Sequence, residues 1–219
     1  MKIAFLGDSI TEGGGSSCEK NRYVNKVSEI LGIETLNYGI SGTRIAKQME
    51  KSEDPSYDKD FIDRVDEIDK NCSFVFVFGG TNDYGHGFAP IGDALGEDLD
   101  PYNFCGAVRL LISKIENRFG KGKMCFMLPL RRFGDENICG EGKKPARGTL
   151  ENYVEMIKYI ATKHGIDYID LYNNGFEKPL VCTGDDLTID GLHPNDKGHL
   201  LVAKKVCEYI VSKKELYNK

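Results

Sequence analysis

The sequence predicts an α/β protein in which a parallel sheet is covered by helices on both faces. Two observations lead to this prediction. Short, strongly apolar runs alternate along the chain with stretches whose apolar residues recur every three or four positions. The runs are typical of buried strands, and the recurring spacing is typical of amphipathic helices. Strands that alternate with helices in this way form βαβ crossovers, which make the strands parallel.

Five apolar runs are the expected strands: 2–6 (KIAFL), 33–38 (IETLNY), 73–78 (SFVFVF), 123–128 (KMCFML) and 166–170 (IDYID). The run at 73–78 has no polar face. This is the pattern of a central strand of a parallel sheet, because such a strand is buried on both sides.

Five stretches with helical spacing are the expected helices. The first covers 22–31 and the last covers 197–213. The apolar positions of the three between them are Phe61, Val65 and Ile68, then Val108, Leu111, Ile112, Ile115 and Phe119, then Leu150, Tyr153, Val154, Ile157, Tyr159 and Ile160. Glycine follows several of these stretches, and it often ends a helix because it adopts left-handed backbone angles without strain.

The chain is 219 residues long, and no internal repeat, low-complexity tract or Pro/Ser-rich linker divides its sequence. We therefore expect one domain over residues 1–219. Lys and Arg number 29 against 34 Asp and Glu, so the formal net charge is −5. A mildly acidic chain without a basic stripe argues against nucleic acid or an anionic membrane as the main partner.

The cysteines and the N-terminal segment predict a cellular location. Seven scattered cysteines, with no C-x-x-C pair, argue against a disulfide framework or a zinc cluster. The start, MKIAFLGDS, has a five-residue apolar segment and no small-residue cleavage site, which is too short for a signal peptide. No stretch approaches the roughly 18 consecutive apolar residues of a transmembrane helix. We therefore expect a cytoplasmic protein with no membrane partner.

Polar motifs follow the predicted strands. GDS ends at Ser9 after the first strand, GISGT covers 39–43 after the second, and GGTND covers 79–83 after the third. DGLHPND, at 190–196, precedes the last predicted helix. Because ligands of open parallel sheets bind beyond the carboxyl ends of the strands, these motifs predict the rim of an active site.

A serine at this rim needs a base before it can act as a nucleophile. Histidine suits this role because its side chain titrates nearest neutral pH. Of the four histidines, only His193 has a carboxylate placed to orient it, since Asp190 lies three residues earlier in a segment that glycine and proline keep in a turn. Acyl transfer also needs donors for an oxyanion, and Gly42 and Asn82 lie on the same rim.

The motifs, in this order and at these spacings, resemble those of the SGNH hydrolase superfamily, also called the GDSL esterase/lipase family. GDSIT resembles its first block, NYGISG its second, GGTND its third and DGLHPN its fifth, so the resemblance spans Gly7 to Asn195. It implies a flavodoxin-like three-layer α/β/α sandwich with a parallel five-stranded sheet. It also implies ester hydrolysis through a serine acyl-enzyme, without a cofactor.

The resemblance also implies a role for each matching residue. Ser9 would be the nucleophile, His193 the base and Asp190 the acid that orients it. The oxyanion donors would be the backbone N–H groups of Ser9 and Gly42 and the side-chain amide of Asn82. Gly42 is preferred to Gly39 because the family's glycine usually closes the "SG" pair.

Other residues remain open. Asp8, Asp83 and His86 are candidate substrate-binding residues, although Asp8 is also expected to hydrogen-bond its own turn. No metal site is expected, because His193 and His199 are six residues apart without a third ligand nearby. The segments 84–104 and 130–148 are long for connections and leave strand ends, so each could wall the pocket, form a lid or contact another subunit. The basic residues of the second segment fit a solvated charge run better than a site for an acidic substrate; they are Arg131, Arg132, Lys143, Lys144 and Arg147.

Three functions fit these motifs. The favoured one is a serine hydrolase that cleaves a small-molecule carboxylic ester. We expect a short-chain or acetyl ester, and the alcohol of this ester could be a carbohydrate. The second is an acyltransferase with the same triad. The third is a non-catalytic, flavodoxin-like module whose glycine-rich turns bind a phosphate or a nucleotide. The sequence does not specify an oligomeric state.

Overall fold

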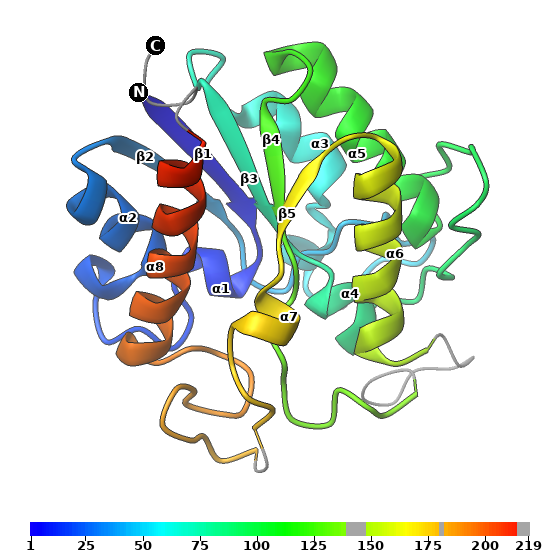
Figure 1. Cartoon of the computed structure of the whole chain (residues 1–219). Helices are drawn as coiled ribbons and strands as arrows, with labels where there is room; N and C mark the ends of the chain where they lie inside the picture. Colours follow the sequence, from blue (N-terminus) through cyan, green and yellow to red (C-terminus); the bar gives the residue numbers. More distant parts are fainter. Residues whose placement is uncertain (139–147, 180–181, 214–219) are drawn as a thin grey trace.

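The computed structural model describes residues 1–138, 148–179 and 182–213. Its centre is a five-stranded parallel sheet in the order β2-β1-β3-β4-β5 (Figure 1). The strands are β1 (Lys2–Gly7), β2 (Glu34–Gly39), β3 (Phe74–Phe78), β4 (Met124–Met127) and β5 (Asp167–Ile169). All five expected strands are present, each within a residue or two of its predicted bounds, so the predicted α/β fold with a parallel five-stranded sheet is confirmed.

Helices cover both faces of the sheet (Figure 1). One face packs against α2 (Tyr23–Leu31) and α8 (Asp196–Ser212). The other packs against α3 (Phe61–Arg64), α5 (Phe104–Phe119) and α6 (Leu150–Lys163). Neighbouring residues of each strand enter different cores because strand side chains alternate between the faces. In β1, for example, Ile3 and Phe5 pack toward α2 and α8, whereas Ala4 and Leu6 pack toward α3 and α5.

Three short helices begin directly beyond strand ends, at the lower side of the sheet in Figure 1. They are α1 (Ser9–Glu12) after β1, α4 (Thr81–Gly85) after β3 and α7 (Leu171–Asn174) after β5. Single 3₁₀ turns lie at η1 (Glu19–Asn21), η2 (Pro55–Asp58) and η3 (Val65–Glu67). The predicted helix around Phe61–Ile68 is therefore one α-helical turn, α3, that continues as η3.

The strand order reverses between β1 and β3. The chain leaves β1 for the edge strand β2, then crosses back to form β3, β4 and β5 on the other side of β1. Such a switch point leaves a crevice at the carboxyl ends of the two central strands. Gly7 and Phe78, the last residues of β1 and β3, are paired in register, so α1 and α4 start beside each other at this crevice.

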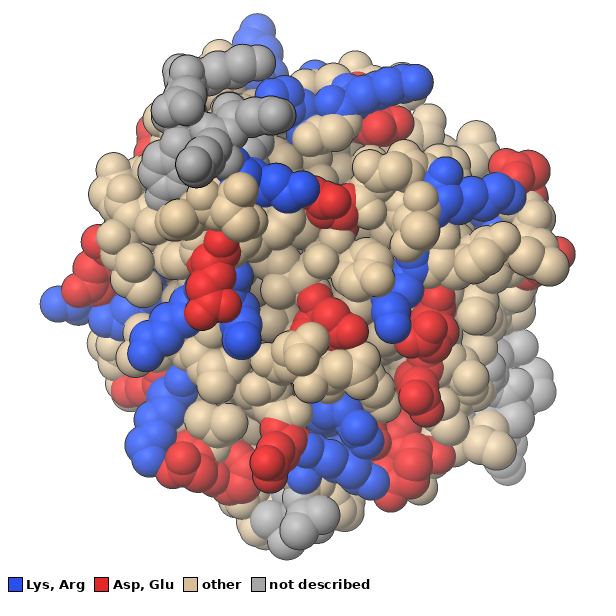
Figure 2. Space-filling model, viewed as in Figure 1, with Lys and Arg blue, Asp and Glu red and all other residues tan. Residues whose placement is uncertain are grey.

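The surface mixes charges of both signs. Figure 2 shows basic and acidic side chains interspersed over the face it presents. Within the described residues, no helix is long and apolar enough to cross a membrane. Cys139, Lys143, Lys144 and Arg147 of the predicted 130–148 segment lie outside the described residues.

Candidate active site

The turn after β1 presents Ser9 at the start of a helix. A β-carbon added to Gly7 would lie 2.0 Å from the Thr11 hydroxyl oxygen, so this close turn requires glycine. Asp8 is the N-cap of α1, and its carboxylate accepts a hydrogen bond from the Ile10 N–H at 3.0 Å. Ser9 is the first residue of α1, where a backbone N–H has no partner inside the helix. Both the hydroxyl and the N–H of Ser9 thus lie at the helix N-terminus.

A chain of side-chain hydrogen bonds links Ser9 to His193 and Asp190. The Ser9 hydroxyl lies 2.9 Å from His193 Nε2, and His193 Nδ1 lies 2.6 Å from Asp190 Oδ2. Ser9 and His193 are 184 residues apart in the sequence. The structure therefore brings together the three residues that the sequence predicted for the triad.

The turn at 190–193 holds Asp190 as an anion. Its second carboxylate oxygen accepts the backbone N–H groups of Leu192 at 3.0 Å and His193 at 2.7 Å. Partial burial alone would raise the pKa of Asp190, but the hydrogen bonds from the His193 side chain and from these N–H groups outweigh it and lower the pKa. Asp190 can therefore orient the imidazole and balance a positive charge on it.

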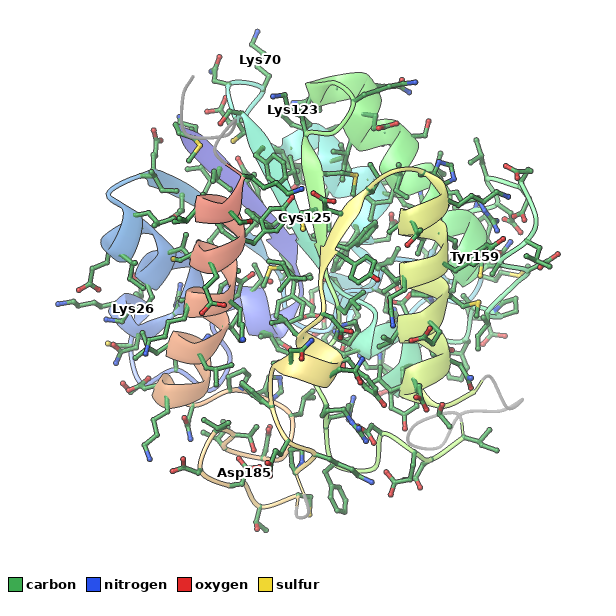
Figure 3. All side chains as sticks on the ribbon, in the orientation of Figure 1. Lys26, Lys70, Lys123, Cys125, Tyr159 and Asp185 are labelled. Atoms are coloured by element: carbon green, nitrogen blue, oxygen red, sulfur yellow. The ribbon has the colours of Figure 1, made fainter. Side chains whose placement is uncertain are left out.

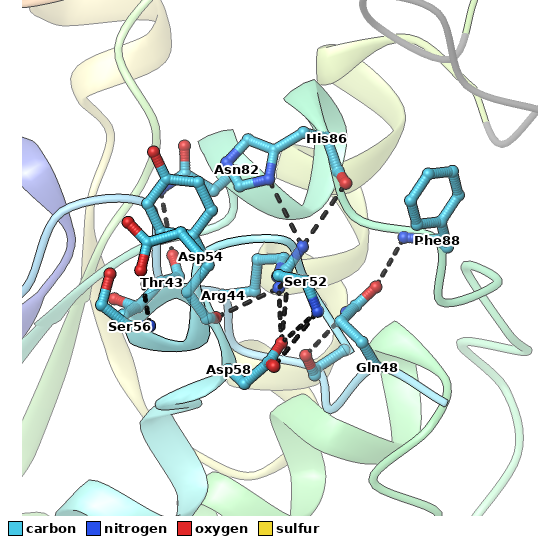
Figure 4. A network of polar contacts seen from close by, with 12 residues as sticks. Thr43, Arg44, Gln48, Ser52, Asp54, Ser56, Asp58, Asn82, His86 and Phe88 are labelled. Atoms are coloured by element: carbon cyan, nitrogen blue, oxygen red, sulfur yellow. Dashed lines mark hydrogen bonds and ion pairs between the residues drawn. The ribbon is translucent and has the colours of Figure 1, made fainter. Parts of the chain in front are cut away.

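The predicted oxyanion residues lie around the same pocket. Its volume is about 400 Å³, and its described lining consists of Ser9, Ser41, Gly42, Tyr57, Asn82, Gly85, His86, Arg132, Leu192 and His193. Asn82 lies in the first turn of α4, where its side-chain amide donates one N–H to the Thr43 carbonyl at 3.0 Å (Figure 4). An amide has two N–H groups, so the second remains for a ligand.

Gly42 and Gly39 have different surroundings. Gly42 lines the pocket with a φ of +74°, and a β-carbon there would lie 2.2 Å from the Tyr57 ring. Gly39 ends β2 against α1, where a β-carbon would lie 2.0 Å from the Glu12 nitrogen. Among the residues described, Gly39 is not part of the pocket lining. The geometry thus favours Gly42 over Gly39 as an oxyanion donor.

The candidate substrate contacts Asp8 and Asp83 do not line this pocket. Asp8 is buried, caps α1, and has its pKa raised to about 7 by burial. Asp83 is also buried, and its carboxylate accepts the N–H groups of Ile45 at 3.0 Å and Ala46 at 2.9 Å. The proposal of substrate contact is corrected for both, because each carboxylate turns inward to satisfy backbone donors. His86 does line the pocket, so its contact with substrate stays a prediction.

One wall of the pocket comes from a segment that the motifs do not include. Tyr57 lies in η2, and its ring centre is 5.5 Å from that of His86. Arg44 joins this wall, since its guanidinium donates to Ser52 Oγ at 2.6 Å and the Tyr57 carbonyl at 3.1 Å and lies 3.3 Å from His86 Nδ1 (Figure 4). Sequence reasoning missed Tyr57, because its segment contains neither a motif nor an apolar pattern.

Of the described residues in the two long segments, only a few line the pocket. In 84–104, Gly85 and His86 line it, while the part around Asp93–Asp98 binds the Arg109 side chain on α5. In 130–148, the described lining residue is Arg132. The solvated interpretation does not hold for Arg132, which is only 9% exposed.

His199 uses both of its ring nitrogens in hydrogen bonds to the backbone. Its Nδ1 accepts the Tyr23 N–H at 3.3 Å, and its Nε2 donates to the Gly14 carbonyl at 3.1 Å. Burial lowers the pKa of His199, which favours the neutral ring that this pattern requires. Among the residues that the structure describes, no group of three or more His, Cys, Asp or Glu could hold a metal ion.

Comparison with known proteins assigns the family. Residues 5–201 match the GDSL-like lipase/acylhydrolase family, and the chain belongs to this family. It is therefore a hydrolase of the GDSL (SGNH) esterase/lipase type, as the motifs indicated. A curated relative is YpmR of Bacillus subtilis (strain 168), which is 24% identical over 95% of this chain and 80% of that protein.

Solved structures share the fold. A protein from Lactobacillus plantarum has a TM-score of 0.80 at 24% identity, covering 97% of both chains. An acetyl xylan esterase has a TM-score of 0.66 at 23% identity over 96% of this chain and 100% of its own. The lipase/acylhydrolase from Enterococcus faecalis has a TM-score of 0.62 at 20% identity over 97% and 96% of the two chains. At these identities the likeness supports the three-layer fold alone.

Proposed function

We propose that this hydrolase cleaves short-chain carboxylic esters, acetyl esters foremost, through an acyl-enzyme on Ser9. The observation that carries the proposal is the continuous hydrogen-bond chain from the Ser9 hydroxyl through both nitrogens of His193 to Asp190. A serine becomes nucleophilic when a base removes its proton, and a carboxylate that fixes the imidazole prepares that base.

Each step has a group in place. His193 Nε2 accepts the Ser9 proton as the serine oxygen attacks the ester carbonyl carbon. The N–H groups of Ser9 and Gly42 and the amide of Asn82 surround the negative oxygen that forms. When the bond to the alcohol breaks, His193 returns the proton to the leaving oxygen. Water then attacks the acyl-enzyme with His193 again as base, which releases the acid and restores Ser9.

The pocket favours a small acyl group. Of the lining residues that the structure describes, Leu192 is the one aliphatic side chain, and the others are polar, aromatic or glycine. A long acyl chain would gain little from such a lining, because its binding energy scales with the apolar surface it buries. The acetyl xylan esterase that shares the fold supports acetyl esters, with an alcohol that could be a sugar.

The test is turnover of p-nitrophenyl acetate, butyrate and octanoate by the wild type and Ser9→Ala. We expect Ser9→Ala to lose about 10⁴-fold in kcat while its thermal unfolding is unchanged. His193→Ala should behave alike, and rates should fall from acetate to octanoate. The control is Ser73→Ala, since Ser73 precedes β3 outside the pocket lining and bonds only the Lys2 carbonyl through its hydroxyl.

Three outcomes would decide against parts of the proposal. Equal rates in wild type and Ser9→Ala would refute the serine mechanism. Equal or rising rates toward octanoate would refute the preference for short chains. Formation of a new ester when an alcohol is added, without release of free acid, would make the protein an acyltransferase with the same triad.

A further inference from the structure

The aromatic ring of Tyr57 closes one side of the pocket, directly against Gly42. A β-carbon added to Gly42 would lie 2.2 Å from two carbons of this ring, so the ring and the glycine backbone are in contact. Tyr57 is 36% exposed and lines the same pocket as Ser9. Its ring centre lies 5.5 Å from that of His86, so the two rings form one aromatic wall. This wall is next to the proposed oxyanion donor, the Gly42 N–H.

Hydrogen bonds hold the backbone of Tyr57 in place. Its N–H donates to the Asp54 carbonyl at 3.1 Å, and its carbonyl accepts from the Arg44 guanidinium at 3.1 Å. Arg44 is 3% exposed and pairs at 3.4 Å with Asp58, whose carboxylate also accepts from the Ser52 hydroxyl at 2.8 Å (Figure 4). The turn η2 is therefore tied to a buried side chain, which gives the Tyr57 ring a defined position.

Tyr57 and His193 come to the pocket from elements on opposite faces of the sheet. Tyr57 lies in η2, shortly before α3, which packs on the same face as α5 and α6. His193 lies shortly before α8, which packs on the other face with α2. Ser9 follows β1, a strand of the layer between them, and its hydroxyl lies 2.9 Å from His193. One side of the pocket thus carries the base, and the other carries the aromatic wall.

We infer that Tyr57 limits the length of the acyl group that the site accepts. The alcohol leaves with a proton from His193, so it lies on the His193 side of Ser9. The acyl oxygen binds donors that include the Gly42 N–H, at a distance of about 3 Å. The acyl chain therefore begins beside the ring that covers Gly42, and a longer chain collides with this ring. The inference rests on the proposed function, and it names the residue that makes the site selective for short chains.

The test is a ratio of rates on esters that differ only in the acyl chain. Tyr57→Ala replaces the ring by a hydrogen atom on the β-carbon and opens the wall. We expect its kcat/KM for p-nitrophenyl butyrate relative to acetate to exceed the wild-type ratio about 10-fold, a typical effect of one or two methylene groups in a pocket. Tyr57→Leu should shift the ratio in the same direction by a smaller factor. Tyr57→Phe keeps the ring and should keep the wild-type ratio.

Two controls isolate the acyl side of the pocket. Tyr159→Ala also removes a tyrosine ring, but Tyr159 is 41% exposed and lies on the outer side of α6 (Figure 3), so rates and ratio should not change. In a second series the acyl group stays acetyl while the alcohol grows from ethyl to butyl to hexyl, and release of acetic acid is measured. Tyr57→Ala should keep the wild-type order and ratios in this series, because the alcohol lies on the His193 side.

Three results would overturn the inference. The first is an unchanged butyrate-to-acetate ratio in both Tyr57→Ala and Tyr57→Leu, with both variants folded by circular dichroism. The second is a shift in the alcohol series as large as that in the acyl series. The third is an equal loss on every ester, which would make Tyr57 a structural residue only. In each case the wild type would still hydrolyse acetate through Ser9. A wild type without Ser9-dependent turnover, or one that prefers octanoate, would instead refute the proposed function.

Discussion

At the scale of single residues, Asp8 lies next to the candidate nucleophile yet performs a different task. Its carboxylate caps α1 and is 2% exposed. Burial raises its pKa from 3.8 to about 7, against the opposing effects of the Ile10 N–H, His193 and Arg64. The motif thus places a cap and a nucleophile in consecutive positions, and only the second faces the pocket.

This pKa predicts how stability depends on pH. A carboxyl group with a higher pKa in the folded chain than in the unfolded chain favours folding while it is protonated in both states. That contribution is complete below about pH 4 and is lost as the pH rises through about 7. Asp8→Asn keeps an oxygen acceptor for Ile10 but cannot ionise. We expect its free energy of unfolding to fall less between pH 5 and pH 8 than that of the wild type, by on the order of 1 kcal/mol or more.

Urea unfolding at pH 5 and pH 8 measures this difference. Asp186→Asn is the matched control, because it removes the same negative charge from an exposed position. If Asp8→Asn and the wild type lose the same free energy of unfolding between these pH values, the carboxyl of Asp8 does not titrate as its burial requires.

At the scale of elements, α8 and the glycine run after α1 support the histidine segment together. The Nε2–H of His199, on α8, donates to the Gly14 carbonyl at 3.1 Å. A β-carbon on Gly14 would lie 2.9 Å from the His193 ring, and one on Gly15 would lie 2.2 Å from the Pro194 carbonyl oxygen. His199 therefore acts on His193 through Gly14, as a positioning residue.

This contact predicts a difference between two substitutions. His199→Gln can still donate to the Gly14 carbonyl, whereas His199→Leu cannot. Because small displacements of a catalytic base cost about 10²-fold, we expect His199→Leu to lose 10- to 100-fold in kcat with little change in KM. His199→Gln should retain most of the rate. Steady-state kinetics measures both variants, and circular dichroism checks that they are folded to the same extent. If the two variants lose activity equally, His199 only fills space and does not position His193.

At the scale of the whole molecule, Arg64 joins the elements that meet at the site. It is 2% exposed and donates to the carbonyls of Gly7 at 3.0 Å and Tyr38 at 2.7 Å, at the ends of β1 and β2. It also donates to Thr43 Oγ1 at 2.9 Å and the Lys59 carbonyl at 3.1 Å. Burial lowers its pKa to about 10, so the guanidinium stays charged at neutral pH. One side chain thus fixes the strand ends that carry Ser9 and Gly42.

Removing this side chain should therefore destabilise the whole fold. Arg64→Met leaves buried carbonyl groups without donors, which costs about 1–3 kcal/mol for a buried group. We expect a loss of about 2–4 kcal/mol in the free energy of unfolding, measured by chemical denaturation. Arg118→Met, which removes an exposed arginine with one bond to the Ile68 carbonyl, should cost less than about 1 kcal/mol. Equal losses in the two variants would show that Arg64 does not join these elements.

Local patterns in the sequence predicted the fold, and they singled out three residues that hydrogen bonds join in the structure. The five strands follow from continuous apolar runs, because a parallel strand buried on both faces has no polar alternation. Ser9, Asp190 and His193 stood out because each lies in a short motif at a predicted strand exit or helix entry. Each apolar run and each motif consists of consecutive residues, so it can be read directly from the sequence.

The sequence by itself thus determined the α/β class, the family and the residues of the proposed triad. Only the tertiary structure decided which side chains share the pocket with them. Tyr57 and Arg132 line it, while Asp8 and Asp83, adjacent in sequence to Ser9 and Asn82, turn inward. The physical reason is that pocket lining depends on long-range packing and on which buried polar groups need partners. A buried backbone N–H group that lacks a backbone partner often binds a nearby carboxylate instead. No local sequence pattern shows which carboxylate will bind which N–H group.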